Sequence, residues 1–251
     1  MLVLLPPSET KATGTDGPPL DLASLSFPSL TRTRAALLRE LVSLAKRRRG
    51  ALQKALGLSD GQRHELDKNS ALMTAPTLPT LALYTGIVYD NLDYPSLTGT
   101  ARERADSSLV VASALFGLLR PVDRVPSYRL SGGTVLPASG GLAGRWRPVL
   151  QPALREVGGL TVDLRSGAYA ALAPLPSAVQ VRVLRDEGAR RTVVSHDNKW
   201  TKGLLARALC LEGAETVAEV AALGRTVCDD VEVEGSRVDL LLHGLASARP
   251  S

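Results

Sequence analysis

The 251-residue sequence contains few aromatic residues, cysteines and histidines. Aromatic side chains make up 4% of the chain, too few for the broad base-stacking surface of single-strand nucleic-acid binders. The two cysteines, Cys210 and Cys228, cannot supply a disulfide framework. The three histidines, His64, His196 and His243, show no metal-ligand spacing with cysteine or glutamate. We therefore expect neither a bound metal nor a cofactor.

Long hydrophobic runs and a recognisable leader are also missing. The longest apolar runs, residues 1–5 and 109–119, are too short to cross a bilayer. The N-terminus lacks the basic region and the cleavage site of a signal peptide. We therefore expect a cytoplasmic protein that has no membrane partner.

The overall charge of the chain is moderately basic. Lys and Arg total 30 against 25 Asp and Glu, which gives a formal net charge of +5. Such a balance can attract nucleic acid or nucleotides. The arginine-rich composition of a protein from a GC-rich genome would produce the same excess. Charge alone therefore leaves the partner open.

Hydrophobic spacing predicts helices and strands mixed along the whole chain, without a linker or a repeat. An apolar strand opens the sequence, a helix runs from Thr31 to Gly50, and a longer helix spans 101–119. The C-terminal part predicts strands over 160–164, 178–184, 191–195 and 227–233, and helices over 146–157, 199–211 and 214–223. This order indicates an α+β (mixed α/β) fold in a single compact domain, residues 1–251.

Residues 51–68 form a helix-hairpin-helix candidate. Two short helical stretches flank the tight turn Gly57–Gly61, and such a hairpin can direct backbone N–H groups at a phosphate. An ordinary connection between packed helices has the same spacing. The preceding run Lys46–Arg49 could contact DNA, but cations at a helix C-terminus also interact favourably with the helix dipole.

The densest polar segment is residues 119–133. Arg120 and Arg129 offer planar guanidinium groups suited to phosphate or carboxylate, and Asp123 can orient one of them. Arg120 and Asp123 could instead cap a helix end and pair with each other. The glycine-rich segment 139–144 lacks the ending of a phosphate-binding P-loop and is interpreted as a flexible connection.

The motif SALFGLLRPVD at Ser113–Asp123, followed by PSYRL at Pro126–Leu130, closely resembles the signature of the YaaA family, also called DUF328 or UPF0246. The resemblance extends over nearly the whole chain. It implies a compact α/β fold with a helix-hairpin-helix element and a basic cleft that binds double-stranded DNA. It also implies a role in peroxide resistance and in limiting intracellular iron.

The resemblance transfers a set of motif positions onto this chain. These are Tyr84, Gly86, Gly117, Arg120, Pro121, Asp123, Tyr128, Arg129, Ser166, Tyr169, Lys199, Lys202 and Gly203. Two segments depart from the family pattern. The loop Pro6–Lys11 places its lysine two positions later than the family's Ser-Pro-Ala-Lys loop, with Glu9 where a cation would stand. Residues 195–202 replace an aromatic-rich stretch.

From this resemblance we expect the binding partner to be double-stranded DNA or a phosphate-bearing small molecule. The expected phosphate-binding residues are Arg120, Arg129, Lys199, Lys202 and Arg207, and Gly86, Tyr128 and Ser166 are expected to line the cleft. Lys199, Lys202 and Arg207 start a predicted helix, where the dipole favours anions. A solvated basic helix face is the alternative.

Two functional hypotheses stay open at this point. The first is a DNA-binding stress protein that grips duplex phosphates with little sequence preference. The second is an enzyme that acts on a nucleotide or nucleobase by glycosidic-bond or lyase-type chemistry, with Lys11, Tyr84, Asp123 and Tyr169 as catalytic candidates. In either case we expect Arg120, Asp123, Arg129, Tyr84 and Tyr169 to converge on one concave site. A purely structural protein would leave these charged residues without a role.

Overall fold

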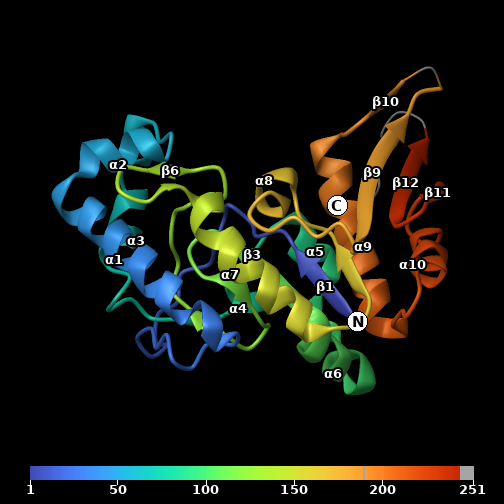
Figure 1. Ribbon diagram of the computed structural model, residues 1–251, viewed down its shortest axis with the longest axis horizontal. Helices are drawn as coiled ribbons and strands as arrows, with labels where there is room; N and C mark the ends of the chain where they lie inside the picture. Colours follow the sequence, from blue (N-terminus) through green and yellow to red (C-terminus); the bar gives the residue numbers. More distant parts are fainter. Residues whose placement is uncertain (189, 244–251) are drawn as a thin grey trace.

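A twisted, largely parallel sheet forms the centre of the computed structural model, which describes residues 1–188 and 190–243 (Figure 1). Its strands are β1 (Leu2–Leu5), β3 (Leu109–Ser113), β4 (Gly117–Leu119), β8 (Thr161–Asp163), β9 (Val179–Asp186), β10 (Arg191–Thr192), β11 (Asp230–Glu234) and β12 (Arg237–His243). In the described part of the chain the order is β11-β12-β9-β8-β1-β3-β4, with β10 beside β9. The expected mixed α/β fold is confirmed.

Helices and two small strand pairs surround this sheet. The helices are α1 (Thr31–Arg47), α2 (Arg49–Ala55), α3 (Glu65–Ser70), α4 (Thr80–Leu83), α5 (Ile87–Leu92), α6 (Gly99–Ser108), α7 (Leu142–Val157), α8 (Gly167–Ala170), α9 (Ser195–Glu212) and α10 (Val217–Gly224). Short 3-10 turns lie at Pro28–Leu30, Asp60–Gln62 and Tyr94–Ser96. The small pairs are β2 (Leu78–Pro79) with β5 (Arg124–Val125), and β6 (Val135–Leu136) with β7 (Gly140–Gly141).

Strand β1 lies inside the sheet, between β8 and β3. All four of its residues are 0% exposed, and it pairs in parallel with β3 on one edge and β8 on the other. Strands β3 and β4, which come next in this sheet along the sequence, lie on one side of β1. Strands β8, β9 and β12 come later in the sequence and lie on its other side. In open α/β sheets, a crevice forms where the connections diverge in this way, outside the carboxyl ends of the strands.

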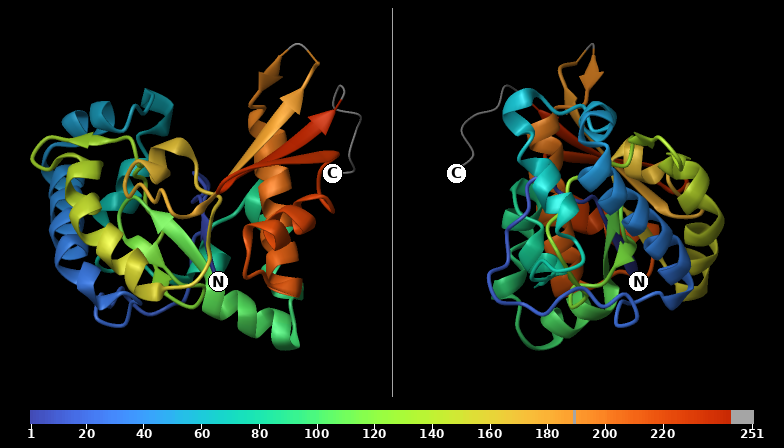
Figure 2. Two further views of the ribbon diagram at one scale, coloured as in Figure 1. Left: turned by 45° about the vertical axis from the view of Figure 1, so that its right-hand side comes forward. Right: turned by 90° about the vertical axis from the view of Figure 1, so that its left-hand side faces the viewer.

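Helices cover both faces of the sheet, with α7 on one side and α9 on the other (Figure 2). A Cβ atom at Gly117, whose φ is +74°, would lie 2.7 Å from the Trp146 ring of α7. A Cβ atom at Gly203 of α9 would lie 2.5 Å from the Val88 carbonyl oxygen of α5. Gly117 and Gly203, two of the three glycines of the family motif, therefore allow close packing around the sheet.

A buried arginine attaches α1 to the edge of the sheet. Arg34 is 0% exposed; its Nε donates to the Phe116 carbonyl at 2.8 Å and its Nη2 to the Leu118 carbonyl at 2.7 Å. Burial lowers the pKa of Arg34 to about 10, so the guanidinium stays charged at neutral pH. The side chain thereby satisfies carbonyls at edge strand β4, which would otherwise be buried without partners.

The helix predicted over 101–119 is wrong in its second half. Helix α6 ends at Ser108, and the chain continues as strands β3 and β4. Every residue of both strands is buried. A strand covered on both faces has a continuous apolar sequence without alternation, which periodicity cannot distinguish from a buried helix.

Other boundaries also differ from the predictions. Gly50 lies inside α2, because the first helix already ends at Arg47. Helix α9 begins at Ser195 and α7 at Leu142, so part of the glycine-rich segment 139–144 is helical rather than a flexible connection. The predicted strand over 191–195 is reduced to β10, the strand predicted over 227–233 is β11, and β12 was not predicted.

The helix-hairpin-helix stays unconfirmed. Helices α2 and α3 flank the turn, as the spacing suggested. However, the Gly57 and Leu58 N–H groups donate to the Lys54 and Gln53 carbonyls at 3.1 Å each. These turn amides already have partners inside the protein, as an ordinary connection between helices requires.

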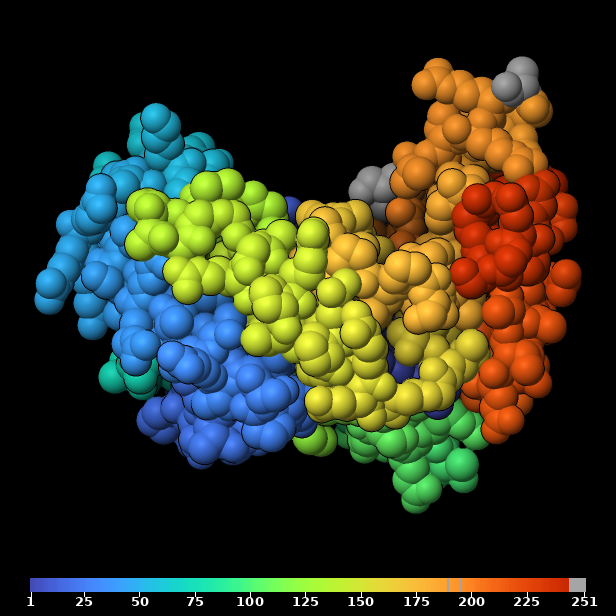
Figure 3. All heavy atoms as spheres, in the orientation of Figure 1, coloured from blue at the N-terminus to red at the C-terminus, as the bar shows by residue number. Residues whose placement is uncertain are grey.

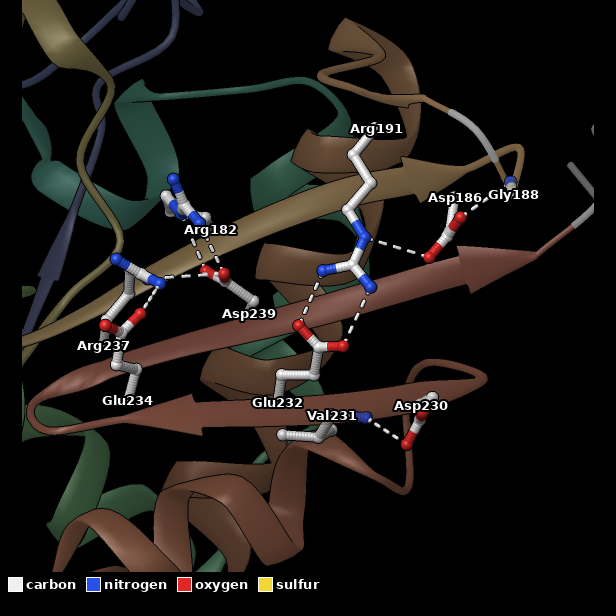
Figure 4. A network of polar contacts seen from close by, with 10 residues as sticks. All are labelled: Arg182, Asp186, Gly188, Arg191, Asp230, Val231, Glu232, Glu234, Arg237 and Asp239. Atoms are coloured by element: carbon white, nitrogen blue, oxygen red, sulfur yellow. Dashed lines mark hydrogen bonds and ion pairs between the residues drawn. The ribbon is translucent and has the colours of Figure 1, made fainter.

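Ion pairs cover the sheet face near β9, β11 and β12 (Figure 4). Arg182 Nε donates to Asp239 Oδ1 at 2.7 Å, and Arg237 Nε lies 3.3 Å from the same carboxylate. Farther along, Arg191 binds both oxygens of Glu232 at 2.6 and 2.8 Å. Burial raises the pKa of Asp239, but the hydrogen bond and charge of Arg182, with Arg237, outweigh burial and hold it below its usual value.

We predict that Asp239→Asn lowers the free energy of unfolding by about 1–2 kcal/mol at pH 7, because two partly exposed arginines lose their shared carboxylate. The folded-state pKa is depressed, so this contribution is present at neutral pH and is lost as the pH falls through that pKa. Urea unfolding at several pH values measures it. Exposed Glu232→Gln is the control and should cost less. A loss that is equal at pH 7 and pH 3 would contradict this account.

Candidate functional site

A cavity of about 730 Å³ lies at the carboxyl ends of β1 and β8. Five segments line it: residues 6–11, 85–89, 129–133, 164–169 and 198–202. Its size lies within the range of small-molecule sites, roughly 300–1,000 Å³. The surface is hollowed between the lobe of α1–α3 and the arm that carries β9 and β10 (Figure 3). The cavity therefore occupies the crevice that the strand order creates.

The loop after β1 is held in place by contacts at several points. The Tyr89 hydroxyl donates to the Pro6 carbonyl at 2.8 Å, and the Thr85 N–H donates to Ser8 Oγ at 3.1 Å. Farther along, Lys11 forms an antiparallel backbone bridge with Tyr84. Lys11 is therefore fixed by backbone contacts, although it lies in an irregular loop.

The Lys11 ammonium group lies against two aromatic rings at the cavity wall. Its Nζ is 4.5 Å from the Tyr128 ring centroid and 5.3 Å from that of Tyr84, and it donates to the Ser8 carbonyl at 2.9 Å. The rings favour the charged form. Burial and the positive charge of Arg129 oppose it and lower the pKa of Lys11 to about 7. Ammonium and neutral amine are therefore both populated at neutral pH.

Tyr84 and Tyr128 direct their hydroxyls into the core. The two hydroxyl oxygens lie 2.9 Å apart, and the Tyr128 hydroxyl is 2.7 Å from Ser113 Oγ. Burial raises the pKa of both tyrosines. Neither residue lines the cavity. Their rings thus support Lys11, and Tyr84 is poorly placed as a proton donor to a ligand.

Asn69 of α3 fixes the backbone of Arg129. Its side-chain amide donates to the Arg129 carbonyl and accepts from the Arg129 N–H, both at 2.8 Å. Asn69 is fully buried, whereas the Arg129 guanidinium reaches the cavity, 3.5 Å from the Glu9 carboxylate. The sequence analysis missed Asn69, because a single asparagine in a short polar helix carries no pattern.

The loop after β8 and helix α9 form a further part of the cavity wall, and a buried ion pair lies behind it. Arg165 Nε and Nη2 bind the Asp163 carboxylate at 2.8 and 2.7 Å. Lys202 Nζ donates to the Arg165 carbonyl at 3.4 Å, and burial lowers its pKa to about 8. Lys199 is exposed at the mouth. Asn198 lines the cavity, and its Oδ1 is buried without a hydrogen-bond partner among the described residues.

Tyr169 lines the cavity, as does Tyr89, whose hydroxyl donates to the Pro6 carbonyl. Burial raises the pKa of Tyr169, which keeps the hydroxyl protonated, although a hydrogen bond from the Gly132 backbone partly offsets this shift. Gly86 and Ser166 line the cavity as expected. Of the predicted site residues, the structure thus brings together Lys11, Gly86, Arg129, Ser166, Tyr169, Lys199 and Lys202.

The expected convergence is wrong for Arg120 and Asp123. Asp123 Oδ1 accepts from the N–H and the hydroxyl of Ser26 at 2.9 Å each, and its Oδ2 accepts from the Arg120 N–H at 2.7 Å. The Arg120 guanidinium donates to the Ser107 carbonyl. This segment forms a cap at the end of strand β4, outside the cavity, and not at the helix end that the alternative expected.

Arg207 also lies away from the cavity. Its Nη1 donates to the Leu92 and Asp93 carbonyls at 3.1 and 3.0 Å, which satisfies the C-terminal end of α5. Among the described residues, no three His, Cys, Asp or Glu side chains gather as a metal site would require. No helix in the described ranges is long and apolar enough to cross a membrane.

The fold and the cavity define an α/β protein with a cation-lined site at the carboxyl edge of its sheet. The family model described as peroxide stress protein YaaA matches residues 1–226, and the chain belongs to this family. A UPF0246 protein of Streptomyces coelicolor is 44% identical over 259 aligned positions, covering 97% of this chain and 99% of that protein. A UPF0246 protein of Corynebacterium glutamicum is 44% identical, covering 92% and 95%.

We predict that Asn69→Ala lowers the free energy of unfolding by about 2–4 kcal/mol, because two backbone groups of Arg129 lose their partners in a buried setting. Chemical denaturation measures the loss. Ser70→Ala on the same helix removes one exposed hydrogen bond and is the matched control. Equal effects of the two substitutions would show that Asn69 does not fix the cavity wall.

We predict that neither thiol of the folded protein reacts readily with hydrogen peroxide. Burial raises the pKa of Cys210 to about 12 and also raises that of Cys228, and thiolate is the form that peroxide oxidises. Thiol titration after peroxide treatment should find both cysteines intact, whereas urea-unfolded protein should lose them. Rapid loss from the folded protein would instead identify a cysteine-based peroxide sensor.

Proposed function

We propose that this member of the peroxide stress family binds the phosphate backbone of duplex DNA across the mouth of the cavity, with little sequence preference. One observation carries the proposal. Lys11, Arg129, Lys199 and Lys202, from three separate segments, meet at one cavity, and Glu9 is the only carboxylate among its described lining residues. Such a gathering of cations suits a phosphate ligand.

Exposed cations on the neighbouring lobe support a polyanionic partner. Lys46, Arg47 and Arg48 at the end of α1, Lys54 on α2 and Arg63 before α3 are all exposed. This lobe faces the arm across the hollow in the surface (Figure 3). Cations on the lobe and at the cavity mouth could contact separate phosphates of one duplex, which fixes position without reading sequence.

A second candidate function is an enzyme that acts on a nucleotide or nucleobase by glycosidic-bond or lyase-type chemistry. The observation that favours it is the position of Lys11, half-buried in the cavity wall with a pKa of about 7. A phosphate contact alone is better served by an exposed lysine, which stays charged. Tyr169, protonated and in the same cavity, provides a candidate proton donor.

We predict salt-dependent duplex binding, measured by fluorescence anisotropy with two unrelated duplexes at 50 and 200 mM salt. Affinity should fall steeply with salt. In a plot of the logarithm of the binding constant against the logarithm of the salt concentration, each phosphate contact should contribute about one unit of negative slope. Lys199→Ala and Arg129→Ala should each weaken binding several-fold and flatten this dependence, because each removes one such contact.

Arg155→Ala is the matched control. Arg155 is exposed in the last turn of α7, which leads into the amino end of β8 and so lies at the opposite edge of the sheet. Its loss should leave binding unchanged. Absence of binding at low salt, or affinity that does not change with salt, would contradict duplex binding.

A further inference from the structure

The Lys11 side chain makes hydrogen bonds in the cavity wall that a lysine does not need for phosphate binding. Its Nζ donates to the Ser8 carbonyl at 2.9 Å and to the Glu9 carbonyl at 3.4 Å. A neutral amine has two N–H bonds, so these two carbonyls can accept both of them. The nitrogen lone pair then has no intramolecular donor in these contacts, and the side chain lines the cavity.

The surroundings of Lys11 favour an amine that changes protonation state without moving. The rings of Tyr84 and Tyr128 stabilise the ammonium, whereas burial, Arg129 and Lys68 destabilise it. The loop is fixed by its bridge to Tyr84 and by the Thr85 N–H at Ser8. A nucleophilic lysine needs this combination of a neutral fraction and a fixed position.

We propose that Lys11 is the nucleophile that forms an imine with the aldehyde carbon of a phosphorylated sugar bound in the cavity. This inference rests on the phosphate-binding function proposed above for the cavity. Arg129 and Lys199 hold the phosphate by charge-assisted hydrogen bonds. Tyr169 and Asn198, which line the same cavity, provide polar side chains for the sugar.

The reaction balances without an oxidant or a metal. The Lys11 lone pair adds to the aldehyde carbon, the carbonyl π pair moves to oxygen, and a proton from the Tyr169 hydroxyl or from water neutralises that oxygen. The nitrogen of the adduct loses one proton, which gives a neutral carbinolamine. Its hydroxyl is then protonated and leaves as water while the nitrogen lone pair forms the C=N bond of an iminium ion. The iminium N–H proton finally returns to Tyr169 or to water. Amine and aldehyde thus yield imine and water.

Lys202, a buried lysine of the same cavity, is less suited to this step. Burial lowers the pKa of Lys202 to about 8, and the negative charge of Asp163 partly offsets this lowering and so favours the ammonium. Its Nζ also donates to the Arg165 carbonyl, next to the buried Asp163–Arg165 pair. We assign Lys202 to electrostatic binding of the ligand and Lys11 to the covalent step.

The aldehyde has two chemically equivalent sources. One is a free sugar phosphate that opens to its aldehyde form, and the other is an abasic deoxyribose within a DNA strand. Both present an aldehyde carbon close to phosphate. The cavity recognises this shared chemistry, and the experiment separates the two sources.

The test is reductive trapping with sodium cyanoborohydride. The protein is incubated with 2-deoxyribose 5-phosphate, or with a duplex that contains one abasic site, and adducts are located by peptide mass spectrometry. We expect a reduced adduct, equal to protein plus sugar less one oxygen atom, on the peptide that carries Lys11. Unphosphorylated deoxyribose should be trapped at least tenfold more slowly. A duplex with a tetrahydrofuran abasic analogue, which lacks the aldehyde, should give no adduct.

The pH dependence and a variant provide further readouts. Trapping should rise with pH through a midpoint near 7, set by Arg129, Lys68, Glu9 and Glu65 and by the two tyrosine rings around Lys11. Lys11→Arg keeps the charge but cannot form an imine, so its adduct should disappear while its circular dichroism spectrum is unchanged. Because the wild-type adduct is mapped directly, the test does not depend on how the variant folds.

Each outcome either supports or overturns the proposal. An adduct on Lys11 with only one substrate supports it and identifies the source of the aldehyde. An adduct on Lys202 or on the N-terminal amine, or none with either substrate, overturns it. Salt-dependent binding of intact duplex without trapping would retain the proposed DNA function and reject the imine. Trapping of the sugar phosphate without duplex binding would reject the DNA function alone.

Discussion

The complete burial of β1 between two parallel neighbours is the constraint on which the rest of the structure depends. A strand with both faces and both edges covered leaves no room for polar side chains, which explains its purely apolar sequence. Polar side chains that can contact a ligand therefore first occur after the strand ends, in the loop of residues 6–11. Because β8 lies beside β1 and runs parallel to it, the loop after β8 reaches the same edge of the sheet.

Buried contacts next to the carboxyl edge of the sheet hold the loops of the cavity wall in fixed positions. The Tyr84, Tyr128 and Ser113 hydroxyls form a hydrogen-bonded chain in the core, and the two rings above it hold Lys11. The Asn69 side chain hydrogen-bonds to the backbone of Arg129 and thereby fixes the segment that carries the Arg129 guanidinium. Loops of this kind carry function when a scaffold fixes their backbone.

Local patterns predicted the mixed α/β fold, the opening strand, α1 and most C-terminal elements, because these segments have one polar and one apolar side or a short apolar run. They failed at β3, which is apolar on both faces and therefore resembled the end of a helix. For the site, the polar segment 119–133 pointed to Arg129, and the resemblance supplied Tyr169 and Lys202; the cavity brings all three together.

Other site features could not be predicted from the sequence. Arg120 and Asp123 share their motif with Arg129, yet they form a cap at β4, because backbone hydrogen bonds decide where such side chains point. Asn69 and the Asp163–Arg165 pair act through contacts between segments or within the core. Isolated polar residues of this kind show no spacing that would distinguish them from surface residues.

Hydrogen–deuterium exchange with and without a duplex tests the central claim, that the cavity at the carboxyl edge of the sheet is the ligand site. The account predicts that amides of residues 6–11, 129–133 and 198–202 exchange more slowly when duplex is bound at low salt. It also predicts that this protection disappears at high salt, whereas exchange in α10 and β11 is unaffected. Protection confined to α10, β11 or the amino edge of the sheet would contradict the account.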